Sequence, residues 1–144
     1  MAEEVWRGVV RKTLEKLNKK LEVESAIVFG SWSRRGGGEW SDVDLLVVTD
    51  GVKNVNVLDR FYIAVECKAP RMDIFLYTYE ELESMAKKGN PLALSALVDG
   101  LPIKLSERVS NLIEYARRRY ERRGRFYVEK QLLQRQRFNP SPWA

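Results

Sequence analysis

The sequence contains no histidine and a single cysteine, and both shortages limit its chemistry. Without histidine, a general base has to be a carboxylate, and a metal site has to be built from oxygen ligands. The one cysteine, Cys67, cannot form an internal disulfide, which favours a reducing compartment. Histidine-based catalysis and a fold held by disulfides are therefore excluded.

Long apolar runs are missing as well. No stretch approaches the roughly 18 residues that a membrane-spanning helix needs, and residues 1–11 lack the apolar core of a signal peptide. We therefore expect a cytoplasmic protein that makes no use of a membrane. With 144 residues, of which 44% are apolar and 31% charged, the chain has the balance of one globular domain.

The spacing of apolar residues predicts a small mixed sheet with flanking helices. Apolar residues between positions 5 and 21 recur at helical spacing, which predicts a helix. Short apolar runs at 26–29, 43–48 and 72–77 predict three strands. Between the last two strands we expect an amphipathic helix that packs its apolar face on the core. That face consists of Val57, Leu58, Phe61, Tyr62 and Val65. The fold class is therefore α/β (α+β).

Capping signals predict where the later helices begin. Thr78 and Glu81 have the spacing of a capping box, and Asn90 followed by proline supplies a second N-cap. Ser106 is expected to cap a third, longer helix. Residues 101–105 are expected to form a short edge strand, because the proline within them cannot donate a hydrogen bond to a neighbour.

The C-terminal part is strongly basic. Residues 117–137 contain nine arginines and lysines against two acids, and a last helix is expected from Gly124 to Phe138. We divide the chain into a core, residues 1–105, and a helical, basic C-terminal extension, residues 106–144, packed on or beside it. Because aromatic residues interleave the arginines, the extension suits a protein partner better than nucleic acid.

Two acids stand at the beginning of the second strand. Asp42 and Asp44 are two residues apart, so in a strand they point to the same side. The strand that follows is apolar on both faces. Two like charges at its beginning repel each other, and burial beside an apolar strand adds a desolvation cost to each of them. A cation between them relieves both effects, and carboxylate oxygens favour Mg²⁺ or Mn²⁺.

A phosphate-binding turn is expected just before these acids. Gly30 and Ser31 end the first strand, where the glycine allows close approach of the backbone and the serine offers hydroxyl and amide donors. Arg34 and Arg35 follow one turn later and could neutralise a triphosphate.

A third acid, Asp73, lies in the third strand with Phe75 and Tyr77 on its own side. If that strand pairs beside the second, three carboxylates converge into the kind of site that clamps two metal ions for phosphoryl displacement. With no histidine present, Asp73 is also the best candidate to accept a proton from an attacking hydroxyl.

Gly30-Ser31, the spacing to Ser41-Asp42-Val43-Asp44-Leu45, and the later Asp73 resemble the polymerase-beta-type nucleotidyltransferase superfamily, in its minimal branch. The one departure is Arg35, which stands where the family commonly has a glycine. The resemblance implies a nucleotidyltransferase-type core, metal on Asp42, Asp44 and Asp73, and phosphates near Ser31.

The resemblance also implies a reaction. Mg²⁺-bound ATP would donate AMP to a hydroxyl, and the favoured acceptor is a tyrosine of a helical HEPN-type partner, as in toxin–antitoxin pairs. Two alternatives stay open. One is a small-molecule nucleotidyltransferase, for which a homodimer would have to supply the missing substrate domain. The other is a non-catalytic module that binds nucleotide or RNA.

Overall fold

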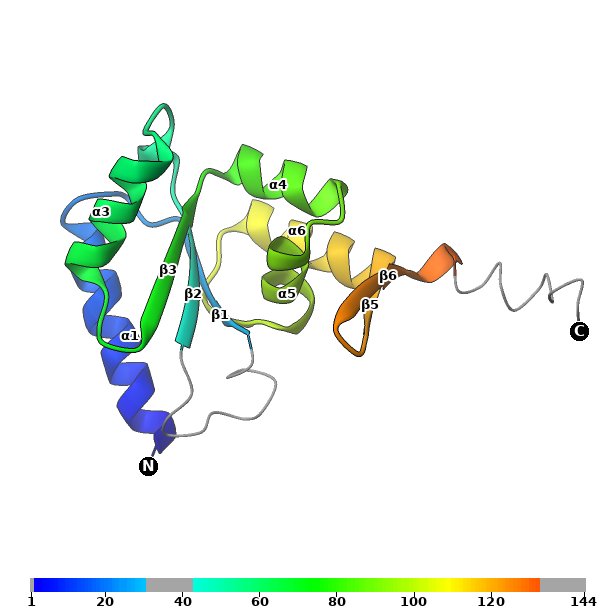
Figure 1. Ribbon diagram of the computed structural model, residues 1–144, viewed down its shortest axis with the longest axis horizontal. Helices are drawn as coiled ribbons and strands as arrows, with labels where there is room; N and C mark the ends of the chain where they lie inside the picture. Colours follow the sequence, from blue (N-terminus) through cyan, green and yellow to red (C-terminus); the bar gives the residue numbers. More distant parts are fainter. Residues whose placement is uncertain (1, 31–42, 133–144) are drawn as a thin grey trace, which may run out of the picture.

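The computed structural model describes residues 2–30 and 43–132, arranged around a four-stranded sheet (Figure 1). The strand order is β3-β2-β1-β4, in which β2 and β3 are parallel and the other pairs antiparallel. The strands are β1 (Ser25–Phe29), β2 (Val43–Val48), β3 (Met72–Tyr77) and β4 (Leu101–Lys104). The three predicted strands and the edge strand are confirmed.

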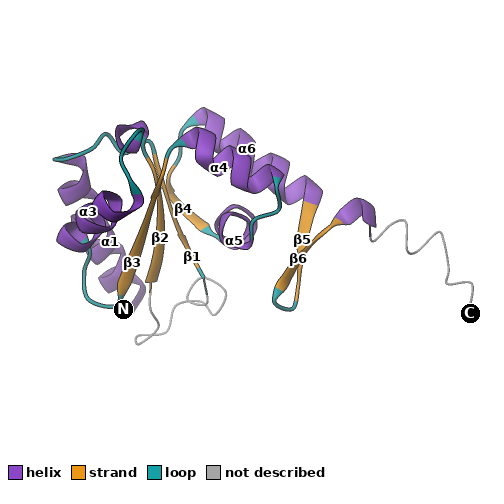
Figure 2. Ribbon diagram, turned by 45° about the horizontal axis from the view of Figure 1, so that its top comes forward, coloured by secondary structure: helices purple, strands orange, loops and turns teal. Residues whose placement is uncertain are grey.

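Helices cover both faces of the sheet, as Figures 1 and 2 show. One face packs against α1 (Ala2–Asn18) and α3 (Val57–Cys67). The opposite face packs against α4 (Tyr79–Lys87), α5 (Pro91–Asp99) and α6 (Glu107–Arg119). A short 3-10 helix, η1 (Asp50–Val52), follows β2. The predicted mixed α/β class is therefore confirmed.

The core consists of two apolar layers because β1 and β2 alternate between the two faces. Ile27 and Leu46 are buried under α4–α6, whereas Val28 and Leu45 are buried under α1 and α3, all at 0% exposure. Both faces of the central strands are thus covered, as their almost wholly apolar sequence predicts. Within the described ranges, no helix is long and apolar enough to cross a membrane.

Polar caps begin three helices at the predicted residues. The Thr78 hydroxyl accepts from the backbone amide of Glu81, whose carboxylate accepts in return from the Thr78 amide. The Asn90 side chain accepts from two amides at the start of α5, and Ser106 caps α6. These caps satisfy amides that have no partner inside the helix, and the three predicted starts are confirmed.

Helix α3 forms as predicted, but its apolar face points outward. The five apolar side chains of the predicted face are exposed, at 82% for Val57, 60% for Leu58, 60% for Phe61, 57% for Tyr62 and 43% for Val65. The residues that face the sheet include Ala64 and Cys67, which are small enough for the helix to pack closely.

The orientation of α3 follows from Arg60 as well. This side chain is only 14% exposed, and it donates hydrogen bonds to the carbonyls of Val52, Val55 and Leu76 and to the carboxylate of Glu81. A polar residue therefore anchors the inner face of α3. The periodicity predicted the helix correctly and its buried face wrongly.

The predicted last helix is wrong over residues 126–129. Strands β5 (Tyr120–Arg123) and β6 (Phe126–Glu129) form an antiparallel hairpin that turns at Gly124, whose φ is +63°. Glycine adopts this left-handed conformation readily, and the Phe-Tyr-Val run of β6 favours a strand. Helix α6 and Tyr120 share the core under the sheet, and the division of the chain at residue 105 stays a prediction.

Candidate active site

Asp44 and Asp73 lie side by side at one end of the sheet. They are the second residues of β2 and β3, and the register of these parallel strands pairs them directly. Neighbouring strands run about 4.8 Å apart, and paired residues point to the same face. The predicted convergence of the strand acids is therefore confirmed for Asp44 and Asp73.

The two carboxylates share the sheet face that is covered by α4, α5 and α6. Leu46 and Val48 continue the side of Asp44, and Phe75 and Tyr77 continue the side of Asp73. Phe29 and Phe75 form a tilted ring pair with centroids 5.7 Å apart. Because Phe29 pairs with Asp44 in the sheet and Phe75 follows Asp73 by two residues, this ring pair lies next to the acids on the same face of the sheet.

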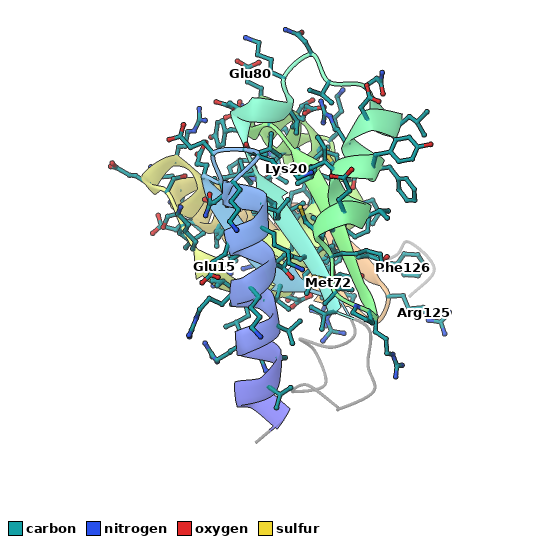
Figure 3. All side chains as sticks on the ribbon, turned by 90° about the vertical axis from the view of Figure 1, so that its left-hand side faces the viewer. Glu15, Lys20, Met72, Glu80, Arg125 and Phe126 are labelled. Carbon is teal, nitrogen blue, oxygen red and sulfur yellow. The ribbon has the colours of Figure 1, made fainter. Side chains whose placement is uncertain are left out.

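Solvent reaches both acids. Asp73 is exposed and Asp44 is partly exposed, although the strands behind them are buried. Figure 3 marks this end of the sheet with Met72, the neighbour of Asp73, well away from Glu80. The end of the sheet where β1 finishes and β2 and β3 begin thus presents carboxylates that a ligand can approach.

Gly30 closes the site from the side of β1. It follows Phe29 with φ of +90°, a conformation that favours glycine. A Cβ atom built on Gly30 would come within 2.4 Å of Oδ2 of Asp44, so the backbone lies directly against that carboxylate. Only glycine fits this position without displacing Asp44.

Four predicted site residues lie outside the described residues. These are Ser31, Arg34, Arg35 and Asp42. Strand β2 begins at Val43, so Asp42 directly precedes it in the chain. The phosphate-binding role of the first three residues and the metal-binding role of Asp42 stay predictions.

The donor chemistry of the described part fits a hard divalent cation. Asp44 and Asp73 offer carboxylate oxygens, which Mg²⁺ and Mn²⁺ prefer, and the chain has no histidine to favour a softer metal. Among residues 2–30 and 43–132, no group of three acidic, histidine or cysteine side chains could hold a metal ion. The described pair would supply part of the predicted ligand set, Asp42 would complete it, and metal binding by all three stays a prediction.

Cys67 has no place in this chemistry. Its side chain is 1% exposed and packs in the cluster beneath α1 and α3. Burial raises the pKa of the Cys67 thiol, which keeps it protonated and unreactive at neutral pH.

A second charged cluster, centred on Arg108, lies at the other end of the sheet. Its guanidinium donates to both oxygens of Glu24, at 2.7 and 2.5 Å, and to Asp50 at 2.9 Å. Hydrogen bonds from Arg108 lower the pKa of Glu24 and of Asp50. The guanidinium also stacks over the ring of Tyr79, 4.4 Å from its centroid.

The Arg108 cluster ties together the start of β1, η1 and α6. The sequence does not reveal this cluster because its members are widely separated along the chain and carry no local motif. Arg108 forms ion pairs with both Glu24 and Asp50, which indicates a structural role.

Comparisons with known proteins assign the chain to a family and relate its fold to solved structures. The sequence matches the family described as "Nucleotidyltransferase domain" over residues 10–125. No curated protein is a significant match. Among solved structures, a candidate nucleotidyltransferase from Sulfolobus solfataricus superposes with a TM-score of 0.53 at 22% identity, over 70% of this chain and 81% of that one.

Two further structures share the fold. A toxin–antitoxin structure with AMP-PNP has a TM-score of 0.50 at 14% identity, over 74% of this chain and 82% of that one. A mutant of the toxin–antitoxin pair MntA-HpeT has a TM-score of 0.50 at 15% identity, over 74% and 80% of the two chains. At these identities the likeness concerns the fold, and it confirms the predicted class.

Proposed function

The chain belongs to the nucleotidyltransferase domain family, and from that membership we propose that it transfers a nucleoside monophosphate, AMP from ATP, to a hydroxyl acceptor. The observation that carries the proposal is the pairing of Asp44 with Asp73 in register on parallel strands. The backbone of Gly30 against Asp44 supports it, because it brings the end of β1 to the same point.

In this reaction the acceptor oxygen attacks the α-phosphorus of ATP, and the bond to the β,γ-pyrophosphate breaks. Asp73 accepts the hydroxyl proton, since it is an exposed carboxylate beside Asp44 and the chain offers no histidine for the task. Pyrophosphate leaves with the electron pair of the broken bond. Gly30, Ser31, Arg34 and Arg35 would bind the phosphates through backbone amides, hydroxyl and guanidinium donors.

Asp42, Asp44 and Asp73 would hold Mg²⁺, with Mn²⁺ as a substitute. When bound, the cation neutralises phosphate oxygens and lowers the barrier to in-line displacement. The carboxylates of this chain position the donor, because their spacing is fixed by the backbone pairing of β2 and β3. The AMP-PNP of one structural neighbour supports an adenine nucleotide as donor.

For the acceptor, we propose a tyrosine of a helical HEPN-type partner protein. Two structural neighbours are toxin–antitoxin complexes, which supports a protein partner for this chain. The basic C-terminal surface is the proposed docking site, formed by Arg117, Arg118, Arg122, Arg123 and Arg125. Phe126, which is 73% exposed, follows Arg125 (Figure 3), and arginine beside an exposed aromatic residue is typical of protein interfaces.

Label transfer tests the reaction. Purified protein, Mg²⁺ and cell extract are incubated with ATP labelled at the α-phosphate, and in parallel with ATP labelled at the γ-phosphate. We expect label on protein from the α-position only, because a kinase would transfer the γ-phosphate instead. Label from the γ-position alone would refute nucleotidyl transfer.

Two variants separate the site from the rest of the surface. Asp42→Asn combined with Asp44→Asn should abolish Mg²⁺-dependent ATP binding, because the carboxylates of the metal site are gone. Asp59→Asn removes one charge from an exposed position of α3 and should bind as the wild type does. Calorimetry with Mg-ATP measures both variants, and undiminished affinity in the double variant would contradict the site.

A further inference from the structure

The outer edge of β3 runs from the candidate site along the sheet. In the part of the chain that the structure describes, β3 has a strand neighbour on one side only, β2. The carbonyls of Arg71 and Tyr77 accept from amides of the β2 side at 2.9 Å each. Because backbone groups alternate along a strand, those of Met72, Ile74 and Leu76 face outward.

One end of this edge is closed by Arg60. Its Nη1 atom donates to the Leu76 carbonyl at 3.2 Å and to Glu81 at 2.8 Å. Proteins commonly protect exposed strand edges with such charged side chains. The protection by Arg60 stops at Leu76. Met72 is buried, at 2% exposure, whereas Ile74 is partly exposed. The outward backbone groups of Ile74, next to Asp73, are therefore the ones left to an incoming strand.

A groove follows the same edge. It has a volume of about 340 Å³ and is lined by Val57, Arg60, Phe61, residues 73–77 and Glu81. Its lining combines exposed apolar side chains of α3, Val57 and Phe61, with residues of β3. Asp73, the proposed proton acceptor, is part of the lining, so the groove is continuous with the site.

We propose that the acceptor is presented as an extended polypeptide segment that pairs with the edge of β3 and places its hydroxyl beside Asp73. This inference rests on the proposed function and names the form of its substrate. Main-chain hydrogen bonds to a sheet edge provide affinity, and side-chain pockets beside the edge provide specificity. The outward backbone groups of Ile74 offer the first, and the apolar side chains of Val57 and Phe61, which line the groove beside it, offer the second.

The two faces of β3 give the acceptor segment a pattern. Asp73 points to the face of α4–α6, whereas Ile74 and Leu76 point to the face of α3. An added strand alternates between the same two faces. The hydroxyl residue therefore lies on the Asp73 side, and residues an odd number of positions away meet Phe61 and Val57, so they should be apolar.

The test titrates the full chain, isotopically labelled for NMR, with one synthetic peptide. The peptide is Lys-Val-Tyr-Val-Thr-Lys, acetylated at its N-terminus and amidated at its C-terminus. Ile74→Pro removes an outward amide that β2 does not use, and Ile74→Ala is its matched control because it shortens the side chain and keeps the amide. We expect the peptide to change the chemical shifts of the protein mainly at residues 72–76. Ile74→Ala should bind the peptide within about threefold of the wild-type affinity, and Ile74→Pro should bind it at least about tenfold more weakly.

N-methylated peptides provide a second readout that does not depend on how Ile74→Pro folds. Methylation of alternate amides removes donors from one side of the added strand only. We expect one alternating set to bind at least about tenfold more weakly than the other. Equal binding of both sets, equal binding of the two Ile74 variants, or no shifts along β3 in the wild type would each overturn strand pairing.

Transfer of α-label to the same peptide separates this inference from the proposed function. A peptide that pairs with β3 and receives no label, with Mg-ATP bound, would contradict nucleotidyl transfer while strand pairing stands. A peptide that receives label without shifts along β3 would contradict strand pairing while the transfer stands.

Discussion

Replacing Gly30 with alanine should weaken nucleotide binding through a single methyl group. The new Cβ atom would lie 2.4 Å from Oδ2 of Asp44, which is closer than van der Waals contact allows, and 3.3 Å from its Cγ atom, which is a tight contact. Either the Asp44 carboxylate rotates away or the end of β1 moves. Both responses disturb the pairing of the acids on which the proposed metal site depends.

The free-energy change has two parts, and Gly124 separates them. Gly124 has φ of +63°, comparable to the +90° of Gly30, but a Cβ atom there meets nothing within 4 Å. Gly124→Ala should therefore lower the free energy of unfolding by about 1–2 kcal/mol, from the left-handed backbone alone. Gly30→Ala should lower it by a similar amount, and in addition weaken Mg-ATP binding by about 10- to 100-fold, as loss of ligand positioning does at metal sites.

Thermal unfolding and calorimetry with Mg-ATP are measured on both variants. In a chain of this size, each kcal/mol corresponds to roughly 4 °C in Tm. The expected result is a similar fall in Tm for the two variants and a loss of Mg-ATP affinity in Gly30→Ala only. Wild-type affinity in Gly30→Ala would refute the role of the Gly30–Asp44 contact, and equal loss in both variants would show that destabilisation explains the effect.

Three other substitutions test Asp73, the hydrogen bonds of Arg60, and the Arg108 cluster. Asp73→Asn should keep most of the affinity for Mg-ATP and lose about 100-fold or more in transfer rate, measured with α-labelled ATP; an unchanged rate would make Asp73 structural. Arg60→Ala removes the guanidinium donor from three carbonyls, of which that of Val52 keeps the Val55 amide. It should lower the free energy of unfolding by about 2–4 kcal/mol, measured with urea. Arg108→Gln should lower it by about 1 kcal/mol at pH 7. Arg108 lowers the pKa of Glu24 in the folded state. The difference in free energy of unfolding between wild type and Arg108→Gln is therefore present above the ordinary carboxyl pKa and should vanish as pH falls through the lowered pKa. A difference that stays constant down to about pH 2 would contradict the pairing.

The sequence predicted the strands and the acids because local pattern and chemistry coincide there. Strand β2 is apolar on both faces and β3 is bounded by turn residues, so both were recognised. The caps of α4, α5 and α6 were correct since capping depends on residues within one turn.

The sequence did not predict what depends on distant partners. The direction of α3 is set by Arg60 and its contacts with carbonyls and Glu81, which lie elsewhere in the chain. The segment after α6 was predicted as a helix and forms a hairpin. A contact with a distant residue holds this hairpin, because the Tyr127 hydroxyl donates to Asp99 at 2.6 Å. In both segments, tertiary contacts decided between structures that the local sequence allows.

The register of β2 and β3 links the candidate site to the hydrophobic core. Successive side chains of a strand point to opposite faces, so a slip of one residue would move Asp73 to the face of α3 and bring Ile74 beside Asp44. The same slip would exchange the packing of Phe75 and Leu76 between the two layers, which are both buried under helices. The hydrophobic core therefore fixes the pairing of the acids, and a core substitution that shifts this register should abolish metal binding without touching either carboxylate.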